Sequence, residues 1–458
     1  MNGVMDSKSA PSRLFVNLLS QVWGRLVSNI GARLLRVPLL LTALGPDDYG
    51  RWLVLASLSS WLSIPQTGTA TVAAGSMSIA TGGGDLSAAR RTYSDLFVFN
   101  SVLFICLALA AFLASAFLPV HTWLGFSAER SGECGRALFA LCIGVLLAGM
   151  AEVFGARLKA SGKSHLPALW QGVTAWLEIV ALFAVVGYSI RFDALAAALL
   201  TVTVCSTLAL YMRSRGVLPE VRFDKSCVSA EGLRLLFGKS LHYQALPLGH
   251  AMLLQGQILV VQWVLGPSSV AVYSTARTVV RVISQGLETV NHSVWPEMSL
   301  LFGSGRMDRI AMLHRSSVLF SLGLSLLSAA LFLLFGPWIY SLASGNNLTA
   351  DRALLICFLI PIPLNAVWYT SSMVQLAGNR HEGVAKRYIL STLVALTFGI
   401  PMTKSLGLAG AALASAVSDL LMIPYVLKRS VTITQDDMKG IWGRAFKDIS
   451  KLPGRYTP

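Results

Sequence analysis

The sequence predicts an all-α, polytopic membrane protein with about 12 transmembrane helices. Of its 458 residues, 54% are hydrophobic and only 13% are charged, whereas about a quarter of the residues in a soluble domain carry a charge. Apolar stretches recur from Leu14 to Leu427 with brief polar interruptions. Water is therefore not the main solvent of the fold, and nothing large is left to fold outside the bilayer.

Each predicted span is an apolar run of about 20 residues, the length that crosses the hydrocarbon core. The N-terminal run is too long for a cleavable signal and is interpreted as the first span. The spans lie at 17–43, 49–75, 93–118, 136–157, 168–188, 194–212, 239–265, 270–300, 311–341, 352–376, 388–402 and 407–427.

Lys and Arg are concentrated in the even-numbered connections between spans, while the odd-numbered ones carry few. By the positive-inside rule this alternation places both termini in the cytoplasm. The same bias accounts for the net charge of +15, so the charge does not indicate a nucleic-acid partner.

The two halves of the chain resemble each other. Leu44-Gly45-Pro46 after the first span recurs as Leu265-Gly266-Pro267 after the seventh, and Met77-Ser78 recurs at the same offset as Met298-Ser299. Gly162 after the fourth span corresponds to Gly378 after the tenth. This order predicts two six-helix lobes related by a pseudo-two-fold axis along the membrane normal, with the substrate site between them.

The predicted organisation has five parts. They are a cytoplasmic N-tail (1–16), an N-lobe (17–212), a cytoplasmic amphipathic linker (213–238), a C-lobe (239–427) and a cytoplasmic tail with an interfacial helix (428–458).

Motifs for enzymatic chemistry are missing. Gly162-Lys163-Ser164 lacks the earlier glycine of a nucleotide-binding loop, because Arg157 stands there. The six cysteines are scattered without metal-ligand spacing. We therefore expect a carrier with no catalytic residues, no cofactor and no metal.

Five arginines lie within predicted spans, namely Arg25, Arg33 and Arg36 in the first and Arg277 and Arg281 in the eighth. Each costs about 2.5–3.5 kcal/mol at the centre of a bilayer, so they must face protein or water. Their excess over acidic residues favours an anionic ligand, and the guanidinium fork suits phosphate oxygens. We predict that they bind substrate.

The other intramembrane charges are candidates for ion coupling or for ion pairs with these arginines. Glu288 and His292 share the helical face of Arg277 and Arg281. The remaining carboxylates are Glu152, Glu178 and Asp419. A purely structural pairing of arginines with these acids is the alternative interpretation.

The stretch Leu44-Gly45-Pro46-Asp47-Asp48-Tyr49-Gly50-Arg51-Trp52 resembles the LGxxxYGxW signature of Wzx-type O-antigen and polysaccharide flippases. These belong to the multidrug/oligosaccharidyl-lipid/polysaccharide (MOP) exporter superfamily. The resemblance covers about residues 14–430, and its motifs are structural. Lumenal arginines on the first helix are similar to those of the lipid-linked-sugar branch, which points to Arg25 and Arg36.

The resemblance implies a flippase that moves undecaprenyl-pyrophosphate-linked oligosaccharide from the cytoplasmic to the periplasmic leaflet by alternating access. The product would serve O-antigen (lipopolysaccharide) or exopolysaccharide synthesis in a bacterial inner membrane. Implied partners are the lipid-linked oligosaccharide and membrane lipids, with a polysaccharide polymerase and a chain-length regulator as candidates. Two alternatives are an ion-coupled exporter of small anions or drugs on the same fold, and a membrane-embedded polysaccharide polymerase or ligase.

Overall fold

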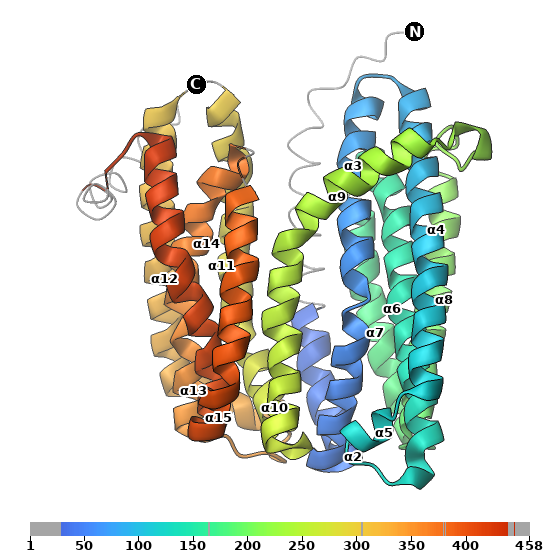
Figure 1. Ribbon diagram of the computed structural model, residues 1–458, viewed down its shortest axis with the longest axis vertical. Coiled ribbons are helices and arrows are strands. Elements are labelled where there is room, and N and C mark those ends of the chain that lie inside the picture. Colours follow the sequence, from blue (N-terminus) through green and yellow to red (C-terminus); the bar gives the residue numbers. More distant parts are fainter. Residues whose placement is uncertain are drawn as a thin grey trace. The chain divides into compact units, whose positions relative to one another are not determined.

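The computed structural model describes residues 29–163, 165–303, 306–378 and 382–437, together with Arg380 and Arg444. Every regular element within these residues is a helix. The chain divides into two compact units, Met1–Pro247 and Leu248–Pro458 (Figure 1). The start of the first predicted span, with Arg25, and the predicted interfacial helix of the tail lie outside the described residues.

The first unit contains the counterparts of predicted spans one to six. Helix α2 is broken at Gly45, where the first span ends and the second begins. The second span continues in α3. The helices are α2 (Asn29–Ser60), α3 (Ser63–Gly82), α4 (Leu86–Phe117), α5 (Val120–Trp123), η3 (Ala128–Arg130), α6 (Ser131–Ala160), α7 (His165–Val186), α8 (Phe192–Arg215), η4 (Lys225–Cys227) and α9 (Ala230–Ala251), which continues into the second unit.

The second unit contains the counterparts of the last six spans. A π-helical turn interrupts the seventh span, and α15 combines the last two, which meet at Gly407. The elements are η5 (Met252–Gly256), α10 (Gln257–Leu265), α11 (Pro267–Gly303), α12 (Met307–Ala343), α13 (Arg352–Leu359), α14 (Pro361–Ala377) and α15 (Glu382–Thr434).

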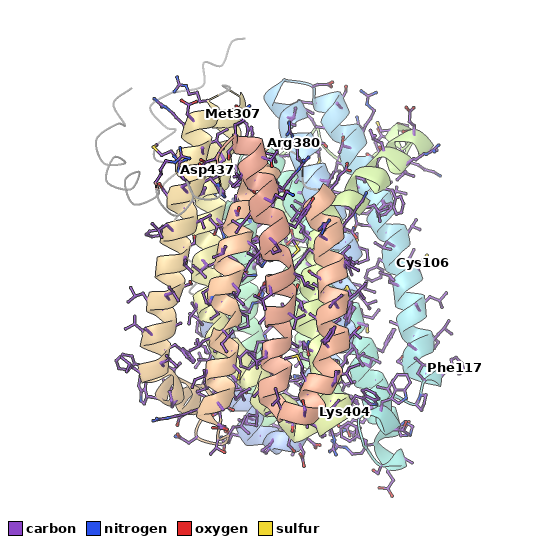
Figure 2. All side chains as sticks on the ribbon, turned by 60° about the vertical axis from the view of Figure 1, so that its left-hand side comes forward. Cys106, Phe117, Met307, Arg380, Lys404 and Asp437 are labelled. Atoms are coloured by element: carbon purple, nitrogen blue, oxygen red, sulfur yellow. The ribbon has the colours of Figure 1, made fainter. Side chains whose placement is uncertain are left out.

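Eight stretches of the described chain are long and apolar enough to cross a membrane by length and composition. The last of these, Glu382–Thr434, holds two predicted spans in one broken helix. Figure 2 shows Met307, Arg380 and Asp437 at one end of the second unit and Lys404 at the other. Exposed apolar side chains such as Phe117, 78% exposed, suit contact with lipid rather than water.

The packing within each unit repeats. In the first unit α6, the fourth span, packs against α3, α4 and α8. In the second unit α14, the tenth span, packs against α11, α12 and α15. The fourth span therefore packs against the second, third and sixth spans. The tenth packs against the eighth, the ninth and the helix that combines the eleventh and twelfth. This agrees with the repeat predicted from the sequence.

Two glycines of the repeat reverse the chain in the same way. Gly45 has φ 76° and ψ 169°, and Gly266 has φ 83° and ψ 177°. This region of backbone conformation is open essentially to glycine alone. The correspondence is weaker elsewhere, because Gly162 has φ +79° whereas Gly378 has φ −80°.

Replacing Gly45 by alanine is expected to destabilise the first unit by about 1–3 kcal/mol, the usual cost of a non-glycine residue in this conformation. A Cβ at Gly45 would meet no atom within 4 Å, so backbone strain alone causes the loss. The control is Gly323→Ala within α12, where space is also open and where alanine favours the helix. Thermal unfolding in detergent measures both; equal midpoints for the two variants would contradict this account.

The residues after Gly45 connect α2 to the segment that follows α5 in the first unit. Arg51 donates to Asp48 at 2.6 Å and to the carbonyls of Leu124 at 3.0 Å and Gly125 at 3.2 Å. Trp52 is 4% exposed, and its ring centroid lies 5.8 Å from that of Phe192. The motif that carries the family resemblance therefore has a structural role at this end of the unit.

Candidate functional site

Two of the predicted arginines lie one turn apart in the second unit, on α11, which packs against α10. Arg277 Nη1 donates a hydrogen bond to the carbonyl of Leu254. Its guanidinium carbon also lies 5.6 Å from the centroid of the Tyr273 ring. One turn further along α11, Arg281 Nη2 lies 3.5 Å from His250 Nε2.

The contact with Leu254 depends on the π-helix η5. Backbone bonds of a π-helix run from residue i to i+5, and such turns are rare and frequent at functional sites. Leu254 lies in the middle of η5, six residues after Leu248, the first residue of the second unit. The irregular turn thus supplies a backbone acceptor for Arg277 in place of a side-chain acid.

Neither Arg277 nor Arg281 forms an ion pair with a carboxylate of the described chain. Glu288 follows Arg281 by seven residues on α11, about 10 Å along the axis, and attracts its charge. Glu288 has interactions of its own. We call His250, Arg277 and Arg281 the α11 basic group. With Glu288 counted, two guanidinium groups stand against one carboxylate.

In the first unit the predicted site residue Arg36 does have a carboxylate partner. Arg36 of α2 pairs with Glu178 of α7, two residues that are 142 positions apart in the sequence. Their side chains are 31% and 23% exposed. The structural alternative considered for the arginines therefore describes this contact at Arg36, and a role of Arg36 in binding substrate stays a prediction.

A cavity of about 260 Å³ between α6, α7 and α8 brings two predicted carboxylates together. Glu178 lines it, and so does Glu152, which accepts hydrogen bonds from Lys159 at 3.1 Å and Gln171 at 2.7 Å. Thr174 also lines the cavity. Each carboxylate is paired with a cation, Glu178 with Arg36 and Glu152 with Lys159. Intramembrane acids that line one cavity are candidates for carrying a proton.

Asp419 of α15 is buried in the second unit, where it faces α14. Its Oδ1 accepts hydrogen bonds from the indole nitrogen of Trp368 at 2.7 Å and from the amide of Asn365 at 3.1 Å. No cationic side chain of the described residues forms an ion pair with it. Its partners are thus neutral donors, which the sequence analysis did not name.

Three other predicted site residues are only partly placed. Arg33 lies on α2 and His292 on α11, while Arg25 is outside the described residues.

A contact that sequence reasoning missed is the buried pair of Arg315 and Asp436, 2.6 Å apart. Asp436 was assigned to a polar tail, although α15 continues to Thr434, beyond the end at 427 predicted for the last span.

No protein-family model and no curated protein matches the chain. Solved structures do resemble it. One, described as the inward-facing conformation of a multidrug resistance MATE family transporter of the MOP superfamily, has a TM-score of 0.74 at 15% identity and covers 92% of this chain and 99% of its own. An outward-facing structure of such a transporter has a TM-score of 0.67 at 15% identity, covering 93% and 96%.

A third similar structure is a MOP superfamily transporter from Pyrococcus furiosus, with a TM-score of 0.63 at 14% identity and coverage of 93% and 96%. It is described by the reverse polarity of its binding pocket, which suggests a different function. Identities this low establish a shared fold and no more. The chain therefore has the fold of the MATE transporters of the MOP superfamily, as the predicted all-α, two-lobe class requires.

Proposed function

We propose that the chain is a flippase for undecaprenyl-pyrophosphate-linked oligosaccharide, moving repeat units of O-antigen or exopolysaccharide from the cytoplasmic to the periplasmic leaflet. The main support is the α11 basic group, in which Arg277 and Arg281 have no carboxylate partner among the described residues. Guanidinium groups without an ion pair in a membrane-spanning helix suit an anion, and their paired N–H groups suit a pyrophosphate.

The fold supports a transporter rather than an enzyme, since its neighbours of similar architecture are described as transporters. The fold does not choose the substrate. The neighbour with a binding pocket of reverse polarity fits the view that the sign of the charge makes that choice. On this basis Arg25, Arg33 and Arg36 of the first helix are further candidates for contact with the pyrophosphate or with acidic sugars.

An ion-coupled exporter of small anions or drugs is the second candidate, and the cavity lined by Glu152 and Glu178 is the observation in its favour. Those carboxylates are compatible with coupling in either case. His292, Glu288 and Asp419 are secondary candidates for such coupling. A membrane-embedded polymerase or ligase is less well supported, because the connections among the described helices are short.

The proposed function predicts the phenotype of a deletion. A strain that lacks this protein should accumulate lipid-linked repeat units in the cytoplasmic leaflet, because their synthesis continues while their export stops. Extraction of the lipids and labelling of surface-exposed sugars in spheroplasts measure both the amount and the leaflet. A strain that accumulates no such lipid, but becomes sensitive to small toxic compounds, would favour the exporter.

A further inference from the structure

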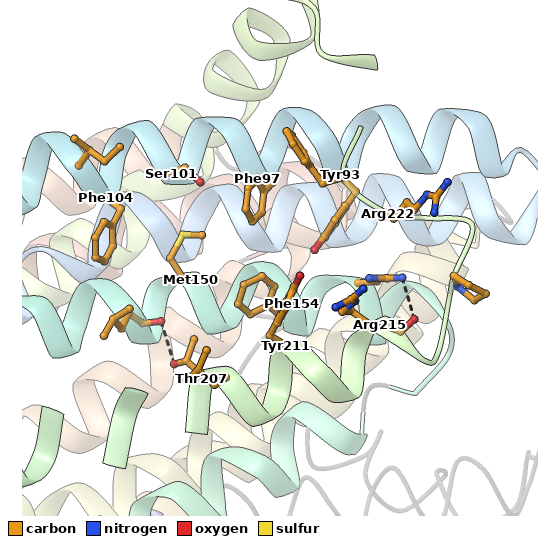
Figure 3. Close-up of a pocket in the computed structure, with 16 residues that line it drawn as sticks. Tyr93, Phe97, Ser101, Phe104, Met150, Phe154, Thr207, Tyr211, Arg215 and Arg222 are labelled. Carbon is orange, nitrogen blue, oxygen red and sulfur yellow. Dashed lines mark hydrogen bonds between the residues drawn. The ribbon is translucent and has the colours of Figure 1, made fainter. Parts of the chain in front are cut away.

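A cleft of about 830 Å³ lies within the first unit (Figure 3). It shares Thr207 with the carboxylate cavity, but neither Glu152 nor Glu178 lines it. Its walls are α4, α6, α8 and the segment that follows α8. The volume is within the range of about 300–1,000 Å³ that is usual for small-molecule sites. The proposed transport function does not use this cleft.

The cleft is polar at one end and apolar along the rest. Figure 3 shows Arg215 and Arg222 at one end, Phe104 at the other, and Tyr93 and Tyr211 between them. The eleven positions from Tyr93 to Phe104 on α4 correspond to about 16 Å of helix. This is about half of the 30 Å hydrocarbon core, which is the depth of one leaflet.

The apolar part of the cleft is open at the side. Ile105 and Leu208 line it and are nevertheless 65% and 55% exposed. Both lie within apolar helices that are long enough to span a membrane, so their exposed surfaces suit contact with lipid. A lipid chain can therefore enter from the bilayer without crossing the unit.

A buried cation marks the polar end. Arg157 is 3% exposed, and its Nε donates to the carbonyl of Leu218 at 3.1 Å. Its Nη2 donates to the carbonyl of Arg215 at 3.4 Å, and its guanidinium carbon lies 5.6 Å from the ring centroid of Tyr93. These contacts fix the guanidinium group, which also interacts with the hydroxyl of Tyr93.

The positive charge at this end is not neutralised by the described chain. Arg157, Arg215 and Arg222 form no ion pair with any described carboxylate, while Asp224 is paired with Arg90. Glu220 is exposed in the same segment, and an excess of cationic groups remains when it is counted. Arg157 is buried, whereas Arg215 and Arg222 are exposed. Cations gathered without an acid favour an anionic ligand.

We propose that this cleft binds one anionic glycerophospholipid of the surrounding bilayer. Its phosphate contacts Arg157, Arg215 and Arg222, and one acyl chain lies along α4, α6 and α8. The three observations agree on this occupant: the cationic end, the length of one leaflet, and the lateral opening. The proposal does not depend on the transported substrate.

The test is native mass spectrometry of the purified full chain, titrated in detergent with phosphatidylglycerol or phosphatidylcholine. The wild type should retain one phosphatidylglycerol and bind it at least tenfold more tightly than phosphatidylcholine. The double variant R215A/R222A should lose about tenfold or more of that affinity, since each surface arginine contributes several-fold to binding of an anionic lipid. Equal affinity of the wild type for both lipids would overturn the proposal.

The matched control is K225A/R234A, which removes two exposed cations outside the cleft, Lys225 in the same connection and Arg234 near the start of α9. It should bind phosphatidylglycerol as the wild type does. If both double variants lose affinity equally, the attraction is a general effect of loop charge and the cleft is not a site.

A second variant tests the chain-binding part. Ser101 lines the apolar half of the cleft (Figure 3), and Ser101→Phe should weaken phosphatidylglycerol about tenfold without removing a charge. Inorganic phosphate should not compete at millimolar concentration. Effective competition by phosphate, or much tighter binding of a polyprenyl phosphate than of phosphatidylglycerol, would overturn the assignment to a bilayer phospholipid.

Discussion

The double variant R277A/R281A should lose at least about 100-fold in the rate of flipping, while the amount of inserted, folded protein stays near that of the wild type. A hydrogen bond to a charged group contributes about 1.5–3 kcal/mol, so the loss of two corresponds to 100-fold or more. The protein level is preserved because neither arginine leaves an orphaned carboxylate among the described residues. Transport and protein level are measured in the same membranes.

Lysine at the same two positions distinguishes binding from packing. R277K/R281K keeps both point charges but loses the guanidinium fork, so it should be partly active. Arg352→Ala, an exposed position at the start of α13 in the same unit, is the control and should be fully active. If R277A/R281A instead disappears from the membrane, or flips at the normal rate, the α11 basic group does not bind the substrate.

The second large effect concerns the pair of Arg36 and Glu178. Arg36→Ala should lower the yield and the thermal midpoint of the protein, because Glu178 is left without its partner in a partly buried site. The expected cost is about 1–3 kcal/mol, less than the roughly 3–5 kcal/mol of a fully buried pair. Thermal unfolding in detergent measures it.

A double-mutant cycle completes this test, since it isolates the energy of one contact. R36A/E178Q removes both charges and should recover most of the stability that Arg36→Ala loses. If the double variant is no more stable than the single one, the pair does not hold α2 to α7. A double variant that folds but transports poorly would assign Arg36 a part in substrate binding as well.

Most of the fold was predictable because hydrophobic runs and glycine reversals are local signals. The predicted apolar spans coincide with helices wherever the structure describes them. Gly45 and Gly266 adopt the matching conformation that the repeat implied. The last helix extends past its apolar run, because the buried pair of Arg315 and Asp436 fixes the end of α15.

The site was less predictable, since it depends on which helices meet. Periodicity placed Arg277 and Arg281 on one face, but it did not indicate the π-helix that gives Arg277 its backbone acceptor. The pairing of Arg36 with Glu178 joins residues 142 positions apart, for which one sequence holds no signal. The sequence showed Arg157 only as the residue that replaces a glycine of a nucleotide-binding loop, and gave no signal that it is buried.

The most direct measurement is flipping of pyrophosphate-linked oligosaccharide by the purified protein in proteoliposomes. Lipid on the inner leaflet should become accessible to an external glycosidase far faster with wild-type protein than in empty vesicles or with R277A/R281A. A potential negative on the side of origin should speed the movement, because about 2.3 kcal/mol per charge per 100 mV favours export of the anion. Rates equal to those of empty vesicles, together with transport of a small drug or anion, would contradict the account.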